Sequence, residues 1–269
     1  MKKVVSRIYL GLVFLFLYAP ILVLIAFSFN ESKSRAYWTG FSMRWYVQLF
    51  QDDDMLMSLL MSLLVAVAAS VLATLLGTAA AVGISNMKKL PRSMMMNATY
   101  IPVINPEIVM GASFLLLFLF FENTFGIGRG FGTVLIAHTT FCLPYVVLNV
   151  LPKLRQMDSN IYEAAQDLGC SPRQAFRKVV IPEIMPGIFS GFLMSFTFSL
   201  DDFIVTLFVS GPKFTTLPLA IYSMTRRKVS PSINALSTII FVIVLITLII
   251  YNIVDAKQQK KNQRRSKAS

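Results

Sequence analysis

The chain has 269 residues, of which 55% are hydrophobic and only 14% are charged, and its mean hydropathy is +0.65. This composition is too apolar for a water-soluble domain of such length and indicates a membrane protein. The net charge of +12 comes from Lys and Arg residues outside the apolar segments, where they are able to contact anionic lipid headgroups. We therefore expect no nucleic-acid partner.

Six apolar segments are long enough to cross a bilayer. About 20 apolar residues span the hydrocarbon core as a helix, and these segments lack the alternation of barrel strands. We therefore predict an all-α polytopic membrane protein with six transmembrane helices. Residues 1–269 form one transmembrane domain, with spans at about 8–29, 58–85, 94–121, 131–151, 181–210 and 233–254.

The first two spans enclose an aromatic segment. The first apolar run is longer than the h-region of a signal peptide and lacks a cleavage pattern, which predicts an uncleaved helix. Trp38 and Trp45 in the next segment favour a short interfacial helix. The second span carries small residues at helical spacing, which predicts a close helix-packing face: Ala66, Ser70, Ala73, Gly77 and Ala81.

The third and fourth spans each contain one unusual polar residue. Glu107 lies in the third span, where a carboxylate costs about 2.5–3.5 kcal/mol and usually faces a cavity. Pro102 and Pro106 are able to interrupt this helix and direct Glu107 toward a pathway, or Glu107 caps the half-helix that follows Pro106. His138 has no second metal ligand nearby, so we expect a hydrogen-bonded packing residue.

A polar loop at 152–180 interrupts the membrane pattern, and its first half encodes a short helix. Asn160 is a suitable N-cap, with Glu163 at the third helical position. Asp167 follows one turn later on the same face, and Gly169 ends the helix at a position suited to a left-handed turn.

The second half of the loop encodes another helix. Ser171 and Gln174 form a capping box around Pro172, and Pro182 is expected to end the pattern just before the membrane. Two capped helices on a membrane protein favour a docking surface, although an ordinary amphipathic connector has the same spacing.

The fifth span carries two adjacent acids, Asp201 and Asp202, at a depth similar to that of Glu107. Acidic centres at one depth suit a cationic substrate, and Phe198 and Tyr222 are candidates for cation–π contacts. The candidate substrate pathway therefore contains these five residues. Alternatively, one member of the Asp pair bonds a neighbouring helix, because adjacent residues point in different directions.

The distribution of Lys and Arg predicts the orientation of the chain. With the N-terminus inside, 17 of the 25 Lys and Arg residues lie in cytosolic segments. These segments include the loop at 152–180 and the basic tail at 255–269, so both termini are expected to be cytosolic.

The loop resembles a known motif. Glu163-Ala164-Ala165, Gly169 and then Ile181-Pro182 are similar to the EAA loop of binding-protein-dependent ABC importer permeases. The stretches at 199–203 and 217–224 resemble the PotC-type permeases of spermidine/putrescine importers.

The resemblance implies a type I ABC importer permease in a bacterial cytoplasmic membrane, and no enzyme. It implies four kinds of partner: a second permease in a heterodimer, a cytosolic ABC ATPase dimer, an extracytoplasmic binding protein and a polyamine substrate. The chain has no Walker A sequence, so ATP and Mg belong to the ATPase and no cofactor binds here. The implied ATPase-coupling residues are Glu163, Ala164, Ala165, Asp167, Gly169, Ile181 and Pro182.

Other functions remain open at this stage. One alternative is an ABC permease for another small cation or a metal. A second is a proton-coupled secondary carrier, although the chain shows no inverted repeat. A membrane enzyme is disfavoured, since no cluster of catalytic side chains occurs at membrane depth.

Overall fold

The computed structural model describes residues 2–32, 37–227, 231–242 and 245–246. The chain divides into two compact units: unit 1 contains Met1–Leu56 and Ile221–Ser269, and unit 2 contains Met57–Ala220. The whole of the predicted basic tail at 255–269 and the end of the predicted sixth span lie outside the described residues.

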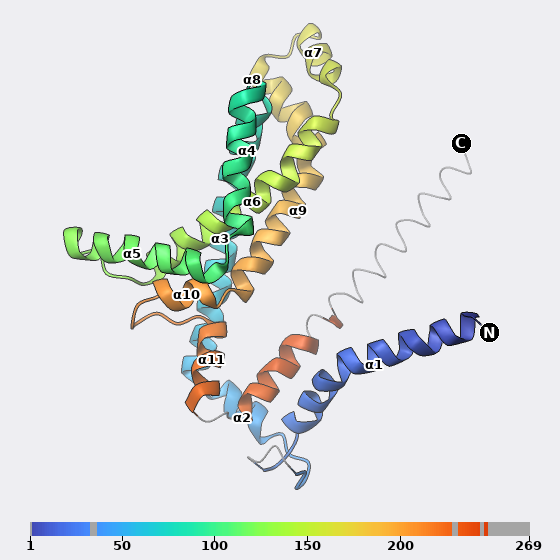
Figure 1. Cartoon of the computed structure of the whole chain (residues 1–269), viewed down its shortest axis with the longest axis vertical. Helices are drawn as coiled ribbons and strands as arrows, with labels where there is room; N and C mark the ends of the chain where they lie inside the picture. The colour runs from blue at the N-terminus through green and yellow to red at the C-terminus, as the bar shows by residue number, and fades with distance from the viewer. Residues whose placement is uncertain (1, 33–36, 228–230, 243–244, 247–269) are drawn as a thin grey trace. The chain divides into compact units, whose positions relative to one another are not determined.

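Helices account for nearly all regular structure in the described ranges, where the only β feature is an isolated bridge between Asn30 and Phe41. Five of these helices are long and apolar enough to cross a membrane, and a shorter apolar helix covers Ser232–Val242. The elements (Figure 1) are α1 Lys2–Ser28, α2 Arg44–Phe50, α3 Asp53–Ser85, α4 Lys89–Ile104, α5 Glu107–Phe125, α6 Phe131–Gln156, α7 Ser159–Asp167, α8 Pro172–Ala175, the π-helix η1 Phe176–Val180, α9 Ile181–Asp201, α10 Ile204–Val209 and α11 Leu217–Arg227.

Unit 1 is organised around the segment between α1 and α2. The Trp45 indole N–H donates to the Asn30 carbonyl at 2.6 Å, and the Trp45 side chain is 1% exposed. The hydroxyls of Ser28 and Tyr46 lie 2.7 Å apart. These bonds fix the short helix α2 against the end of α1, in the segment where the aromatic residues predicted an interfacial helix.

The core of unit 2 lies where α3, α6 and α9 meet. A Cβ at Gly77 of α3 would lie 2.6 Å from the Val146 Cβ of α6, and one at Gly191 of α9 would lie 3.1 Å from the Val146 Cα. The absence of a side chain at both glycines therefore allows the three backbones to approach closely. Ala66, Ser70, Ala73 and Ala81 are fully buried, which confirms the predicted small-residue face.

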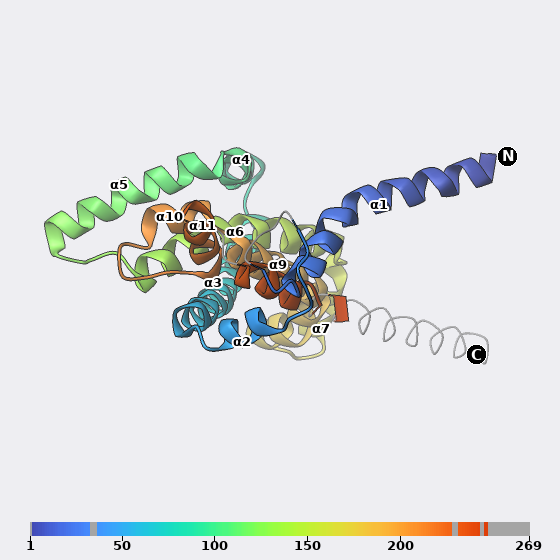
Figure 2. The same ribbon diagram turned by 90° about the horizontal axis from the view of Figure 1, so that it is seen from below.

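Two of the apolar segments are broken inside unit 2. The third one changes direction at Asn105 and Pro106, between α4 and α5, while Pro102 lies within α4 (Figure 1). The fifth is interrupted at Asp202 and Phe203, between α9 and α10. The short helix α10 packs along α5 (Figure 2). The acids of both segments therefore lie at or beside the breaks. Glu107 is the first residue of α5, Asp201 is the last residue of α9, and Asp202 lies between α9 and α10.

Candidate functional site

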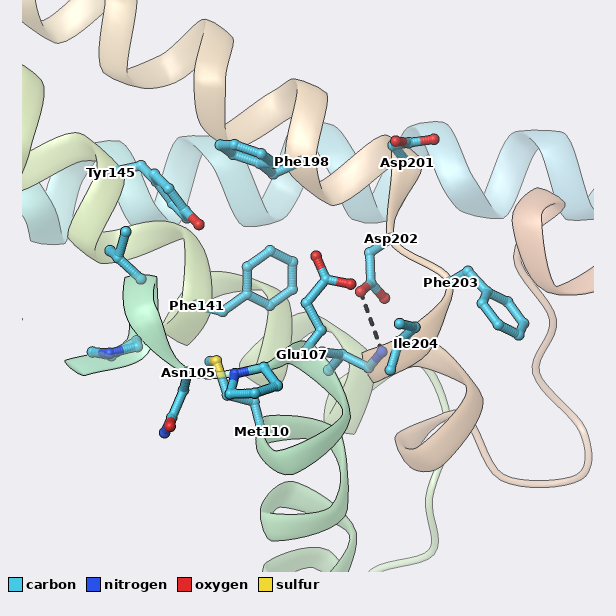
Figure 3. Close-up of a pocket in the computed structure, with 14 residues that line it drawn as sticks. Asn105, Glu107, Met110, Phe141, Tyr145, Phe198, Asp201, Asp202, Phe203 and Ile204 are labelled. Atoms are coloured by element: carbon cyan, nitrogen blue, oxygen red, sulfur yellow. Dashed lines mark hydrogen bonds between the residues drawn. The ribbon is translucent and has the colours of Figure 1, made fainter. Parts of the chain in front are cut away.

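A pocket of about 440 Å³ lies between the two breaks of unit 2. Its walls come from the end of α4, the start of α5, the middle of α6 and the end of α9, and it is drawn in Figure 3. Four of the five predicted pathway residues line it: Glu107, Phe198, Asp201 and Asp202. The fifth, Tyr222, lies in unit 1 and is not among the lining residues.

Glu107 and Asp201 are exposed, and neither carboxylate has a hydrogen-bond or ion-pair partner among the described residues. Glu107 is the first residue of α5, where the helix dipole favours an anion, and its carboxyl group points into the pocket (Figure 3). Asp201 is the last residue of α9. These two acids are therefore available to a bound cation.

Asp202 has a different environment, with 9% of its surface exposed. Its carboxylate accepts hydrogen bonds from the backbone N–H groups of Val205 at 3.2 Å and Thr206 at 2.8 Å. It also accepts one from the Thr206 hydroxyl at 2.8 Å, and it lies 3.3 Å from His138 Nε2. The sequence alternative, in which one acid of the pair bonds a neighbouring helix, describes Asp202.

Aromatic side chains form much of the remaining wall. The rings of Tyr145 and Phe198 have centroids 4.4 Å apart, and Phe141 and Phe203 also line the pocket. Sequence reasoning assigned no role here to Phe141 or Tyr145. Their spacing of four residues on α6 places them on one helix face, and that spacing was the available signal.

The polar loop forms the predicted pair of helices, with a different first cap. We predicted Asn160 as the N-cap, and this is wrong: α7 is capped by Asp158, whose carboxylate accepts from the Asn160 N–H at 3.0 Å. Gly169 has a φ of +88°, as its predicted left-handed turn requires. The Gly169 and Cys170 N–H groups donate to the Gln166 and Ala165 carbonyls, which completes a Schellman motif.

The second helix has the predicted cap and an unexpected continuation. Ser171 and Gln174 form the capping box around Pro172. The prediction that Pro182 ends the helix is wrong, because the chain stays helical from Pro172 to Asp201. The π-helix η1 precedes Pro182, and its wider turn relieves the clash between a proline ring and the preceding turn.

The predicted coupling residues lie on or beside this helical pair. Glu163, Ala164, Asp167 and Gly169 are exposed on α7 and its turn, and Ala165 is half-buried. Leu168 is 88% exposed, whereas Tyr162 packs against the core beneath α7. Ile181 and Pro182 begin α9. The result is a capped, partly apolar surface at one end of unit 2.

Comparisons with known proteins agree with each other. The family model "Binding-protein-dependent transport system inner membrane component" matches residues 73–260. The chain is 41% identical over 233 residues to the putrescine transport system permease protein PotI of Escherichia coli (strain K12), covering 84% of this chain and 82% of that protein. It is 38% identical over 250 residues to the spermidine/putrescine transport system permease protein PotC of the same organism, covering 93% of each.

A solved structure has a similar fold. It is a bacterial ABC transporter involved in the import of the acidic polysaccharide alginate, and it matches with a TM-score of 0.69. The match covers 94% of this chain and 95% of that chain at 14% sequence identity, so it bears on the fold alone.

Proposed function

The chain belongs to the family of binding-protein-dependent transport system inner membrane components, and we propose that it is the permease subunit of an ATP-driven importer of polyamines. Its fold is that of an all-α polytopic membrane protein with ABC permease relatives, and its relatives are transport subunits rather than enzymes. The observation that carries the proposal is a pocket with aromatic walls and two carboxylates that have no partner among the described residues, in a chain whose relatives are permeases of putrescine and spermidine/putrescine transport systems.

The pocket chemistry suits an alkylammonium chain. Glu107 and Asp201 supply negative charge, and Tyr145 and Phe198 supply aromatic rings, a type of side chain whose faces attract cations. Phe141 adds an apolar surface for the methylene groups between ammonium centres. Two carboxylates without fixed partners give weak, exchangeable compensation, and a pathway needs binding that is weak enough to permit release. Tyr222 remains a candidate contact from outside this pocket.

The surface of α7 and α8 is the proposed site of coupling to a separate ATPase. Glu163, Ala164, Ala165, Asp167 and Gly169 form or border α7, and Leu168 presents an exposed apolar side chain beside the turn. Capped ends and packing of the helix pair on the core suit a surface that transmits force as a rigid body. Ile181 and Pro182 join this surface directly to α9, which ends at Asp201 in the pocket.

The mechanism that we propose is alternating access. A loaded extracytoplasmic binding protein docks on the outer loops, and the ATPase dimer, which holds ATP and Mg, closes and moves α7. A second permease subunit completes the pathway as a heterodimer. Both termini and the α7–α8 loop lie in the cytosol, consistent with the distribution of Lys and Arg.

Uptake of radiolabelled polyamine tests the function, in cells that lack this chain and contain no other polyamine importer. We expect spermidine and putrescine uptake to be lost, and to return when the gene is restored. Restoration with Glu107→Gln should return protein to the membrane but little uptake. Spermidine uptake that is unchanged by the deletion would overturn the polyamine assignment and leave a permease for another cargo.

A further inference from the structure

Four buried polar side chains form a connected group behind the pocket. His138 of α6, Ser199 of α9, Asp202 at the break and Thr206 of α10 are 1%, 4%, 9% and 0% exposed, respectively. We refer to these four residues as the His138 cluster. A polar group in such a dry site is costly unless it is hydrogen-bonded, so the contacts within the cluster are strongly constrained.

The imidazole of His138 contacts both sides of the break between α9 and α10. Its Nδ1 lies 2.7 Å from the Ser199 hydroxyl, in the last turn of α9. Its Nε2 lies 3.0 Å from the Thr206 hydroxyl of α10 and 3.3 Å from Asp202 Oδ2. One side chain of α6 therefore joins two helices that no regular backbone ladder connects at this point.

The hydrogen-bond directions place a proton on Nε2. The Thr206 hydroxyl donates to Asp202 Oδ2 at 2.8 Å, so its oxygen is left to accept from His138 Nε2–H. Nδ1 lies 2.7 Å from the Ser199 hydroxyl, and in the neutral ring it accepts a hydrogen bond from that hydroxyl. Every polar atom of the ring is used in this arrangement, with the N–H shared between Thr206 and Asp202.

The break that the cluster holds is also part of the pocket wall. Asp201, Asp202 and Phe203 are consecutive lining residues of the pocket, and Asp201 is exposed at its edge. Phe141 lines the same pocket and lies against His138, with ring centroids 5.1 Å apart. The orientation of Asp201 is therefore determined by a turn that has no glycine or proline of its own.

We infer that His138 is a positioning residue for transport: it fixes the α9–α10 break, which holds the Asp202 carboxylate in the cluster and leaves Asp201 exposed at the edge of the pocket. This inference rests on the proposed polyamine transport. The inference gives His138 no contact with the substrate. The effect of His138 on uptake must therefore pass through Asp201.

The test is spermidine uptake by the complete complex in proteoliposomes, with His138→Leu, Asp201→Asn and the double variant. We expect His138→Leu to lower the maximal uptake rate on the order of tenfold, and to add little once Asp201 is already Asn, because coupled residues are non-additive. Additive losses would mean that His138 acts independently of Asp201 and would overturn the inference.

Two conservative variants separate positioning from packing. The amide of Gln reaches the position of Nε2 and retains a donor for Thr206 and Asp202, whereas the shorter Asn amide reaches only the position of Nδ1. His138→Gln should therefore keep most of the uptake, and His138→Asn should lose as much as His138→Leu. Equal uptake by the Gln and Asn variants would contradict the cluster's role.

Thr139→Val is the matched control, since Thr139 is 8% exposed and its hydroxyl donates within its own helix, to the Leu135 carbonyl, with no other partner among the described residues. We expect its uptake to be unchanged. If His138→Leu fails to assemble, Ser199→Ala takes its place, because it removes only the Nδ1 partner. Its effect on uptake is then measured alone and together with Asp201→Asn. Absent uptake by the unmodified complex would instead overturn the proposed function, while normal uptake by His138→Leu would overturn only this inference.

Discussion

Asp201 and Asp202 are neighbours in the sequence, yet their carboxylates have opposite environments. Asp201 is exposed and unpartnered within the described chain, and Asp202 is buried and accepts three hydrogen bonds. We expect Asp201→Asn to reduce polyamine uptake several-fold without a change in the melting temperature of the complex. Asp202→Asn should lower the melting temperature, because weakening bonds to a buried charge costs about 1–3 kcal/mol. Uptake and thermal unfolding of the purified complex, measured together, check both outcomes.

Glu122→Gln is a matched control for the loss of an acid outside the pocket. Glu122 pairs with Arg129 at 3.0 Å and does not line the pocket, and the pair is partly exposed. Such a pair contributes little, so uptake and melting temperature should both stay near those of the unmodified complex. Loss of uptake by Asp202→Asn with an unchanged melting temperature would assign Asp202 to the pathway instead.

At the scale of the helix, close packing in unit 2 depends on glycines of α3 and α9. Alanine at Gly77 would place its Cβ 2.6 Å from the Val146 Cβ, so the helices must move apart. We expect Gly77→Ala to destabilise the complex by about 1–3 kcal/mol, as overpacking does in other cores. Gly83→Ala on the same helix meets nothing within 4 Å and should leave the melting temperature unchanged or slightly higher. Equal melting temperatures for the two variants would contradict the packing argument.

A second element-scale prediction concerns the turn after α7. Gly169 has a φ of +88° and its N–H donates to the Gln166 carbonyl at 2.8 Å, while a Cβ there would meet nothing within 4 Å. Proline cannot adopt this φ and has no N–H, so Gly169→Pro should deform α7 without disturbing the core. We expect normal membrane insertion, loss of uptake and ATP hydrolysis that no longer responds to the loaded binding protein.

Gly169→Ala is the graded companion of this variant. It keeps the N–H and carries only the strain of the left-handed backbone, about 1–2 kcal/mol, so it should retain part of the uptake. Gly132→Ala, where a Cβ also meets nothing within 4 Å and φ is not positive, should transport normally. Normal, stimulated uptake by Gly169→Pro would remove α7 from the coupling role.

These elements also show how far the sequence predicts the structure. Apolar length predicted the membrane class, and local cap chemistry predicted the Gly169 turn and the Ser171 cap, because such signals act over a few residues. The break at Asp202 carries no local signal, since it depends on His138, which is 61 residues from Ser199 and 68 from Thr206. The acids and Phe198 of the pocket were predicted. Phe141 and Tyr145 were not, because their place in the pocket depends on the packing of α6 against α9, which no local pattern indicates.

At the scale of the whole molecule, orientation links the pocket to the two sides of the membrane. The loop containing Lys213 and the α7–α8 loop lie at opposite ends of α6. A Cβ at Gly211 would lie 2.8 Å from the carbonyl of Arg129, which precedes α6, whereas Asp158 follows the other end of α6. A helix of 26 residues is about 39 Å long at 1.5 Å per residue, which is enough to separate the two aqueous sides.

The native Cys170 provides a direct probe of this orientation. It lies half-buried between α7 and α8, whereas Cys142 is fully buried in α6 and should not react. We expect a membrane-impermeant maleimide to label Cys170 only after the membrane is permeabilised, because the distribution of Lys and Arg predicts that this loop is cytosolic. Lys213→Cys in a Cys170→Ser background should be labelled in spheroplasts, which expose the outer surface. Labelling of Cys170 in intact spheroplasts would invert the topology and separate α7 from any cytosolic ATPase.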